Sequence, residues 1–316
     1  HLVKQPNENT PPMFARVVRN GNALVLTPQF ALTAGNSYHA ILQRPNDSAL
    51  RKVHRIPLPD RTVPKVLAVY PRAKVVPANL LKFYLYFSEP MREGREIFDL
   101  IHLKDASGKS VHSPWRRQEL WSDDARRLAL WIHPGRIKRG VNLRETLGPV
   151  LSPNAEYTLV IDSRMRSATG VPLGRSHHTK FRTGPEDREC PAPQDWMIQT
   201  PAAKAKKPIR ISASESFDHA LLARHQWIED SEGKRIAGQI KIGKGEHLWF
   251  FQPARPWKAN VYRLCVDEWL EDLAGNTPHR KFERHINDPE PLSTVTKIQF
   301  VIHERNGANN PVPLDR

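Results

Sequence analysis

The chain has 316 residues, of which 39% are hydrophobic, so it holds enough apolar side chains for two or three packed domains. No run approaches the roughly 20 apolar residues of a membrane-spanning helix, and two cysteines are too few for a disulfide scaffold. The formal net charge of +15 predicts affinity for a polyanion, unless the positive charge is spread over a solvated surface. No zinc-finger, helix-turn-helix or RNP motif is present, which makes nucleic acid a minor alternative to an anionic polysaccharide or cell-surface glycan.

One pattern occurs three times along the chain. An apolar strand ending in proline, a connection and a second strand opening with tyrosine follow one another at 22–42, 127–161 and 247–266. Such a repeat of short strands, with 28 prolines against 16 glycines, predicts antiparallel β-sandwiches rather than helices. Alternation supports an all-β fold, because every second residue of a strand shares one face. The alternating core positions are Phe83, Leu85, Phe87, then Ile209, Ile211, and Tyr157, Leu159, Ile161.

The repeat predicts four parts of the chain. Residues 1–60 hold only the second half of a repeat, 61–185 form a complete domain with two loop insertions, and 186–287 form another complete domain. Residues 288–316 hold one more strand and a tail. Either the front half of the first domain has been removed or other strands complete its sheet, and because an unpaired sheet edge is costly, the strand near 296–305 is a candidate to complete it.

The strings "LKFYLYFSEPM", "IHLKDASGK", "EYTLVI" and "DLAGN" resemble the bacterial Ig-like domains of the surface-layer and CopC-like group. The resemblance covers 62–184 closely and 192–286 less closely, where "ASESF" stands in place of "FSEPM". It implies tandem Ig-like sandwiches in a secreted or cell-envelope bacterial protein. Modules of this group are mostly spacers, adhesive units or carbohydrate-contacting units, so the resemblance implies no reaction.

The middle domain is enlarged in two places. The proline and the tyrosine of the repeat are separated by 22 residues there, against 9 in the first domain and 8 in the third. The extra residues carry Arg136, Lys138, Arg139 and Arg144, and another enlargement, which comes first in chain order, carries Trp115, Arg116, Arg117 and Trp121. Loops on a rigid scaffold often carry function, so these residues are candidates for binding a glycan. Alternatively, Val141, Leu143, Leu147 and Val150 pack the longer loop onto a neighbour.

The two enlargements flank one strand of about six residues, which places their ends roughly 20 Å apart unless one folds back along the sheet. Tyr84 and Tyr86 lie on the face opposite Phe83, Leu85 and Phe87. They either stack on sugar rings or pack against the first domain.

Chemistry of other kinds has weaker signals. A chain-terminal His1 supplies two nitrogen ligands of the kind Cu(II) prefers, as in CopC-like proteins and lytic polysaccharide monooxygenases. The alternative function is therefore a polysaccharide-active copper oxidoreductase, unless His1 marks only a processing boundary. No GxSxG, P-loop or GxGxxG motif occurs, so we expect no enzyme and no other cofactor.

Two further features of the sequence leave alternatives open. The sequences "DASGK" and "DLAGN" predict tight turns in which Asp accepts backbone N–H groups, with calcium as the alternative. Cys265 faces away from the predicted core, and Cys190 lies in a proline-rich linker. In an exported protein, they are expected to form a disulfide, with free thiols as the alternative.

Overall fold

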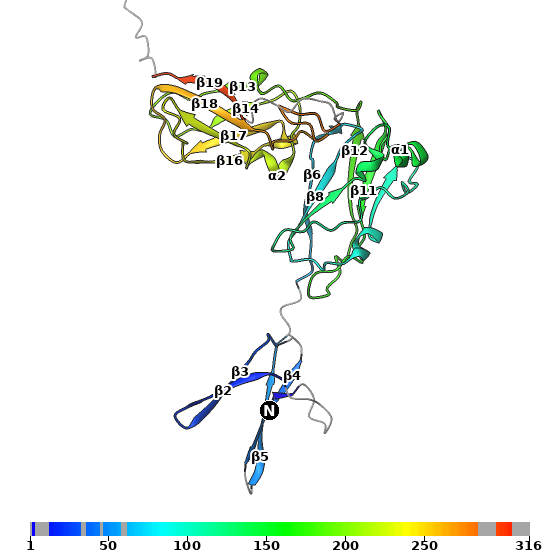
Figure 1. Ribbon diagram of the computed structural model, residues 1–316, viewed down its shortest axis with the longest axis vertical. Helices are drawn as coiled ribbons and strands as arrows, with labels where there is room; N and C mark the ends of the chain where they lie inside the picture. The colour runs from blue at the N-terminus through cyan, green and yellow to red at the C-terminus, as the bar shows by residue number, and fades with distance from the viewer. Residues whose placement is uncertain are drawn as a thin grey trace, which may run out of the picture. The chain divides into compact units, whose positions relative to one another are not determined.

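The computed structural model describes residues 2–3, 13–32, 36–44, 47–57, 62–283 and 295–304 (Figure 1). The chain divides into two compact units, residues 1–62, called the N-terminal unit, and residues 63–316. Strands dominate both units, and the described helices are a few short turns, so the predicted all-β fold is confirmed. No described helix is long and apolar enough to cross a membrane.

The N-terminal unit contains two small antiparallel sheets. One is the hairpin of β2 and β3, and the other has the strand order β1-β4-β5. The strand bounds are β1 Leu2–Val3, β2 Ala15–Asn20, β3 Ala23–Pro28, β4 Ser37–Arg44 and β5 Asp47–Arg55. The two hairpins correspond to the second half of one repeat, so the expected partial domain is present.

The larger unit begins with sandwich A, whose two sheets have the orders β10-β8-β6 and β7-β12-β11-β9 (Figure 1). Side chains of the two sheets meet in its core, where the rings of Phe83 and Phe181 lie 5.4 Å apart. Its elements are β6 Val66–Tyr70, β7 Val75–Val76, β8 Lys82–Phe87, η1 Arg95–Asp99, β9 Ile101–Asp105, β10 Arg127–Trp131, η2 Pro134–Arg136, α1 Asn142–Leu147, β11 Glu156–Ile161 and β12 His177–Thr183.

Sandwich B repeats this plan with sheets of order β13-β14-β17-β16 and β15-β18-β19. Its elements are η3 Pro193–Asp195, β13 Met197–Gln199, β14 Ile209–Ser212, α2 His219–Leu222, β15 Gln226–Asp230, β16 Gly238–Ile242, η4 Lys244–Glu246, β17 Leu248–Pro253, β18 Asn260–Asp267 and β19 Val295–Ile302. The two sandwiches and the partial unit match the predicted Ig-like tandem.

The last strand is placed differently from the prediction. Strand β19 pairs with β18 along its whole length, from Asn260 opposite Ile302 to Asp267 opposite Val295. It therefore completes sandwich B, and the expectation that it completes the first domain is wrong. The reason lies in its side chains, because Phe300 and Ile302 belong to the core of sandwich B.

The alternating core positions are buried as predicted. Phe83, Leu85 and Phe87 are buried in sandwich A, and Ile209 and Ile211 are buried in sandwich B. The tight turns are also as predicted: Asp105 Oδ1 accepts the N–H groups of Ser107 and Lys109. Gly108 in that turn has a φ of +83°, which a residue without Cβ adopts freely.

Sandwiches A and B share a polar interface. The N–H of Leu81 donates to the carbonyl of Leu273 at 3.0 Å, and Asn79 exchanges two hydrogen bonds with the backbone of Asp187. Leu273, from the segment between β18 and β19, belongs to the core of sandwich A. The two sandwiches are therefore joined by ordered contacts.

Candidate functional site

The first enlargement of sandwich A is an added edge strand rather than a free loop. Residue pairs Trp115–Ile132 and Trp121–Leu128 form β-bridges, so residues 115–121 run antiparallel along β10. The ring of Trp115 is buried and lies edge-on to Phe83 at 6.2 Å. The Trp121 ring lies 6.0 Å from that of Phe87 and donates to Glu119. Both rings therefore pack inward, whereas Arg116 and Arg117 are exposed.

The second enlargement folds into η2 and α1 and is held by the buried side chain of Arg136. Its Nη1 donates to the carbonyl of His112 at 2.5 Å, and its Nε donates to that of Gly148 at 2.9 Å. Further bonds reach the carbonyls of Ser113, Leu147 and Pro149. Burial lowers the pKa of the Arg136 guanidinium from its ordinary value. Arg136 therefore ties the two enlargements together.

The expected separation of about 20 Å between the enlargements does not apply, because the first one folds back along β10. Its residue Pro114 accepts a hydrogen bond from the N–H of His133, next to the start of the second. The long loop also contributes to the core of sandwich A through Ile137, Val150 and Leu151, whereas Leu147 is exposed.

The other cations of the long loop have partners within the larger unit. Arg139 and Arg144 both pair with Glu186, and the Lys138 ammonium lies 4.9 Å from the centre of the Phe282 ring. Although burial opposes it, Arg144, Arg188 and Arg139 lower the pKa of Glu186 to about 2. The single carboxylate of Glu186 thus pairs with two cations of this loop.

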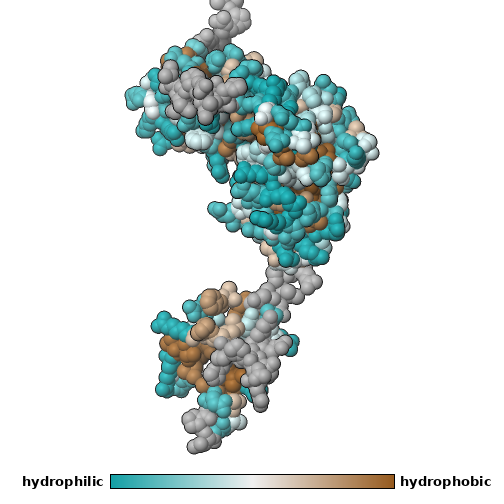
Figure 2. Space-filling model, turned by 45° about the vertical axis from the view of Figure 1, so that its right-hand side comes forward, coloured by the Kyte–Doolittle hydropathy of each residue, from teal (hydrophilic) through white to brown (hydrophobic). Residues whose placement is uncertain are grey.

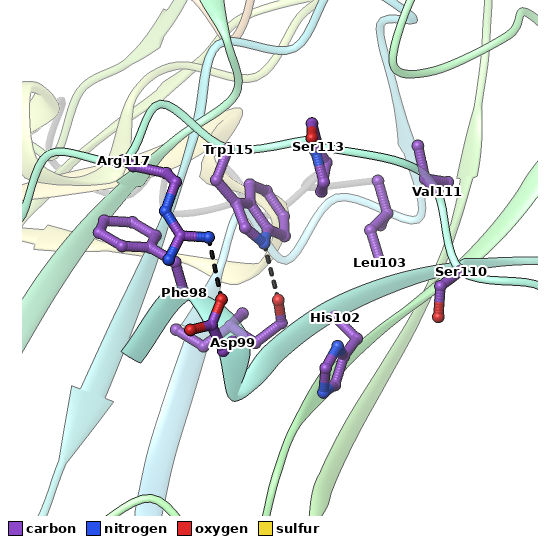
Figure 3. Close-up of a pocket in the computed structure, with 11 residues that line it drawn as sticks. Phe98, Asp99, His102, Leu103, Ser110, Val111, Ser113, Trp115 and Arg117 are labelled. Atoms are coloured by element: carbon purple, nitrogen blue, oxygen red, sulfur yellow. Dashed lines mark hydrogen bonds and ion pairs between the residues drawn. The ribbon is translucent and has the colours of Figure 1, made fainter. Parts of the chain in front are cut away.

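A cavity of about 320 Å³ lies beside the first enlargement (Figure 3). Its wall is formed by η1, β9 and the segment that leads into residues 115–117. The volume is at the small end of the range found for ligand sites. The lining residues are Phe98, Asp99, Ile101, His102, Leu103, Ser110, Val111, Ser113, Pro114, Trp115 and Arg117.

The charged rim of the cavity is ordered by one ion pair. Arg117 Nη1 lies 2.9 Å from Asp99 Oδ1, and the guanidinium carbon lies 5.6 Å from the centre of the Phe98 ring. The hydrogen bond from Arg117 lowers the pKa of Asp99. Figure 3 shows this pair and the Trp115 Nε1 bond to the carbonyl of Ile101, which is 2.7 Å long. The cavity therefore combines fixed donors and acceptors with aromatic surface.

The backbone at the cavity is strained at Ser113, which has a φ of +44°. A residue with a Cβ adopts such a conformation at a cost of order 1–3 kcal/mol, and usually where its surroundings hold it. Here Arg136 holds the carbonyls of Ser113 and its predecessor His112. Strain of this kind is concentrated at functional sites, which favours the cavity as the candidate site.

The structure brings together only part of the predicted set of site residues. Trp115 and Arg117 line the cavity, Arg136 supports it from outside, and Lys138 and Arg139 lie on the long loop. Asp99, His102 and Ser113 were missed, because the sequence gives no signal that the β9 segment meets residues 113–117.

Tyr84 and Tyr86 face sandwich B. The Tyr84 hydroxyl donates to Asp218 at 2.9 Å, and the Tyr86 ring lies edge-on to His219 at 6.0 Å. Burial, and then the nearby charge of Asp218, raise the pKa of Tyr84. The expectation that this pair packs against the first domain is corrected, because α2 of sandwich B covers it.

The two cysteines are free thiols, so the expected disulfide is corrected. Cys265 lies on β18 beside Trp227 of β15 and is buried, and burial and then the Glu229 carboxylate raise its thiol pKa to about 12. Cys190 is half-buried in the linker, where burial raises the pKa of its thiol, the charge of Lys281 opposes this shift, and the charges of Asp272, Glu189 and Asp187 add to it. The two sulfur atoms thus have different surroundings.

One group of metal-ligating side chains lies close together among the described residues. Oxygen atoms of Asp187, Glu215 and Asp272 are all within 4.8 Å of one another. Burial, followed by the charge of Asp187, raises the pKa of Glu215 to about 7. Asp272 also has a raised pKa, mainly from burial, and its carboxylate accepts bonds from Ala274 and Asn276. These three carboxylates are the described residues that could hold a cation.

Sequence reasoning identified only Asp272 of this group, as a turn residue. Glu215 occupies the place of Glu89 in the repeat, and that correspondence was the available signal. The residue proposed for copper, His1, lies outside the described residues, so the copper site stays a prediction.

No family model matches the sequence, and no curated protein sequence matches it. Among solved structures, the chain is similar to the N-terminal part of the bacterial S-layer protein SbsC, with a TM-score of 0.30 and 10% identity, over 77% of this chain and 45% of that one. The chain thus spans less than half of that fragment.

Two further solved structures show similarity at the same level. For alpha-2-macroglobulin from Escherichia coli the TM-score is 0.27 at 11% identity, over 77% of this chain and 72% of that one. For the titin fragment I67–I69 it is 0.23 at 8% identity, over 97% and 88%. Likeness at these values assigns no function to this chain.

Proposed function

We propose that the protein is a non-catalytic Ig-like protein of the cell envelope or the extracellular space that binds an anionic carbohydrate at the cavity of sandwich A. The observation that carries this proposal is the cavity of about 320 Å³, in which Arg117 and Asp99 form an ordered pair beside aromatic rings. Sugar hydroxyls need donors and acceptors at fixed positions, and sugar rings pack on aromatic surface.

The charge of the chain supports an anionic ligand. The net charge is +15, and Arg116 beside the cavity is exposed. Such a surface attracts polyanions and accelerates their encounter. Arg117 is about half exposed, so it can exchange part of its interaction with Asp99 for an acidic group of a ligand.

The experiment measures binding of dextran sulfate by the full chain at increasing salt. Affinity is expected to fall about tenfold between 50 and 300 mM NaCl, because exposed charges are screened. Arg117→Gln should weaken binding about fivefold, which corresponds to ~1 kcal/mol. Arg210→Gln, an equal charge change on the exposed face of sandwich B, is the matched control and should leave affinity unchanged.

Three results would overturn the proposal. Equal losses in the two variants would show that a diffuse basic surface binds polyanions. If the chain bound duplex DNA more tightly than dextran sulfate at an equal concentration of negative charge, nucleic acid would be favoured as the ligand. Absence of binding to every polyanion at 20 mM salt, a condition of weak screening, would remove the polyanion altogether.

A further inference from the structure

Sandwich A has an open side between the edge strands β6 and β12. In the strand order β10-β8-β6, β6 ends one sheet. In the other sheet, β12 pairs on its outer side only with the two residues of β7 among the described strands. Every described strand of sandwich B has a counterpart in sandwich A, where residues 115–121 correspond to β16. The open side therefore belongs to a domain that has the strands of the repeat.

A groove, called here the side groove, runs along this opening. Its main part has a volume of about 350 Å³ and lies between β6 and residues 177–181 of β12. A smaller hollow of about 60 Å³ continues it toward the start of β6. The floor of the main part is formed by the buried residues Val69, Phe83 and Phe181. Apolar side chains reach the surface of the larger unit in small patches among hydrophilic ones (Figure 2).

The edge of β12 presents main-chain hydrogen-bonding groups on the side of the groove. Arg182 N–H donates to the carbonyl of Lys74, which lies next to β7 on the side of β12 away from β11. Main-chain groups of successive residues point to alternate sides of a strand. Because β12 pairs with β11 without a bulge, the N–H and C=O groups of His178 and Lys180 also point away from β11. An edge with such groups is a template for a further strand.

The lining of the side groove is positively charged. Its main part and the smaller hollow contain five exposed cations and no Asp or Glu among the described residues. None of these cations forms an ion pair with a described acid, in contrast to Arg139 and Arg144 of the long loop. A surface of this kind attracts an anionic occupant. The five cations are Lys65, Arg72, Lys74, Arg175 and Lys180.

The combination of strand edge, apolar floor and cations favours a polypeptide as the occupant. An extended segment offers N–H and C=O groups at the spacing of a strand edge, and its side chains point alternately to the floor and to solvent. A glycan would meet the cations but has no main-chain groups for the edge of β12. A second copy of this chain is disfavoured, because two chains of net charge +15 repel each other.

We propose that the side groove of sandwich A binds an extended acidic segment of a partner protein. The segment lies along β12 in line with β7, and its main chain bonds to that of His178 and Lys180. Its apolar side chains cover the floor of the groove, and its acidic side chains meet the surrounding cations, as in β-strand addition generally. This partner is additional to the carbohydrate proposed for the cavity beside Trp115 and does not depend on it.

The test uses the full chain and a short synthetic peptide in which glutamate and valine alternate. Amide hydrogen exchange at His178 and Lys180 should slow about tenfold or more when the peptide is added, because their N–H groups gain acceptors. Exchange at Thr179 and Phe181, whose N–H groups point toward β11, should not change and is the internal reference. The slowing should weaken at high salt, since the cations are screened. A peptide of equal composition, with all glutamates ahead of all valines, should have no effect.

A pair of charge reversals tests the contribution of the cations. Lys74→Glu should weaken binding of the alternating peptide about fivefold, followed by exchange at His178 during a titration. Lys241→Glu, the same change at an exposed lysine of sandwich B, is the matched control and should leave binding unchanged. Both lysines are exposed, so neither change should disturb the fold, and exchange in β8 reports whether sandwich A is intact.

The proposal is overturned if the two peptides slow exchange equally or if neither slows it. It is also overturned if dextran sulfate slows exchange at His178 and Lys180 as the alternating peptide does, because any polyanion would then suffice. Protection of these two amides in the chain alone would overturn it as well. Sedimentation would then show whether a second copy or a segment of the same chain occupies the groove.

Discussion

Sandwiches A and B derive from the same repeat but differ in chemistry at corresponding positions. The turn of sandwich B holds Asp272 and Gly275, where sandwich A holds Ser167 and Gly170. Ser167 Oγ accepts from Val171 N–H, as Asp272 Oδ1 accepts from Asn276 N–H, so one hydroxyl replaces one carboxylate without changing the turn. The two repeats thus share the backbone conformation of this turn, whereas the side chain at a single position determines whether the turn carries a charge.

The edge strands show the same division. In sandwich B, β16 pairs with β17 over five residues, whereas in sandwich A the corresponding residues 115–121 make only two bridges to β10. The cavity lies beside Trp115 and Arg117 of this loosely paired segment. The enlarged loop then braces this region through the buried Arg136, whereas Arg255, which also stands two residues after the proline of its repeat, is exposed.

The two turn glycines give the largest expected contrast. A Cβ on Gly275 would lie 2.2 Å from Cδ1 of Leu81, whereas a Cβ on Gly170 would meet nothing within 4 Å. Both have φ near +86°, so Gly→Ala costs about 1–2 kcal/mol from the backbone at either site. Gly275→Ala should lower the free energy of unfolding by about 2 kcal/mol more than Gly170→Ala does, because its added methyl group overpacks the interface between the sandwiches.

Thermal unfolding of the two glycine variants, followed by tryptophan fluorescence, measures this contrast. All eight tryptophans lie between residues 115 and 269, so the signal reports on the sandwiches. Equal losses in Gly275→Ala and Gly170→Ala would contradict the interface contact at Leu81.

The brace of sandwich A comes next in size. Arg136→Met keeps much of the side-chain volume but removes the hydrogen bonds to five carbonyls. Leaving buried acceptors unpaired should reduce the free energy of unfolding by about 2–3 kcal/mol. Binding at the cavity should fall as well, because the strained Ser113 loses its support.

Arg263→Met is the matched control for Arg136→Met, since the Arg263 side chain in sandwich B makes one hydrogen bond within the described part of the chain, of 3.4 Å, to the carbonyl of Asp230. Denaturant unfolding should show a change within about 0.5 kcal/mol for this control. A similarly small effect of Arg136→Met would show that the long loop stands without its brace.

The acidic group of sandwich B gives the smallest effect and a distinctive pH dependence. Glu215 has a folded pKa of about 7 against an ordinary value of 4.5, so the folded state binds its proton more tightly than the unfolded state does. The resulting stabilisation is fully present below pH 4.5 and is lost as the pH rises through 7. Glu215→Gln should remove this loss and raise stability at pH 8 by about 1–2 kcal/mol, after allowance for partial exposure.

Unfolding of Glu215→Gln and the parent chain is compared between pH 5 and 8 with a chelator present. Glu89→Gln is the control, because Glu89 takes the same place in sandwich A and lies 3.9 Å from Arg126. If stability depended on pH in the same way in Glu215→Gln as in the parent chain, ionisation of Glu215 would not destabilise the folded state.

The sequence predicted the strands and the turns because both depend on neighbours along the chain. Alternation in β8 places Phe83 and Leu85 in the core, and Asp105 caps its own turn. The sequence did not predict which sheet β19 joins, since Ile298 and Phe300 could cover either apolar face. Their choice depends on Tyr262 and Leu264, which lie about 35 residues earlier in the chain.

The candidate site was predicted only in part, for a related reason. The enlargement around Trp115 and Arg117 was visible from its length, but its partners Asp99 and His102 come from η1 and β9. The neighbour of Tyr84 was also missed, because period-two alternation reports which face a residue occupies and not what covers that face.

The path of the chain between β18 and β19 has a consequence for the order of folding. After β18 ends at Asp267, the segment carrying Leu273 and Phe282 packs on the core of sandwich A before β19 returns to pair with β18. Pairing β18 with β19 closes a long loop, and the entropy lost in closing it makes this step slow unless the loop is first anchored. During synthesis, sandwich A emerges first and offers that anchor, so the final strand of sandwich B is the last element to be captured.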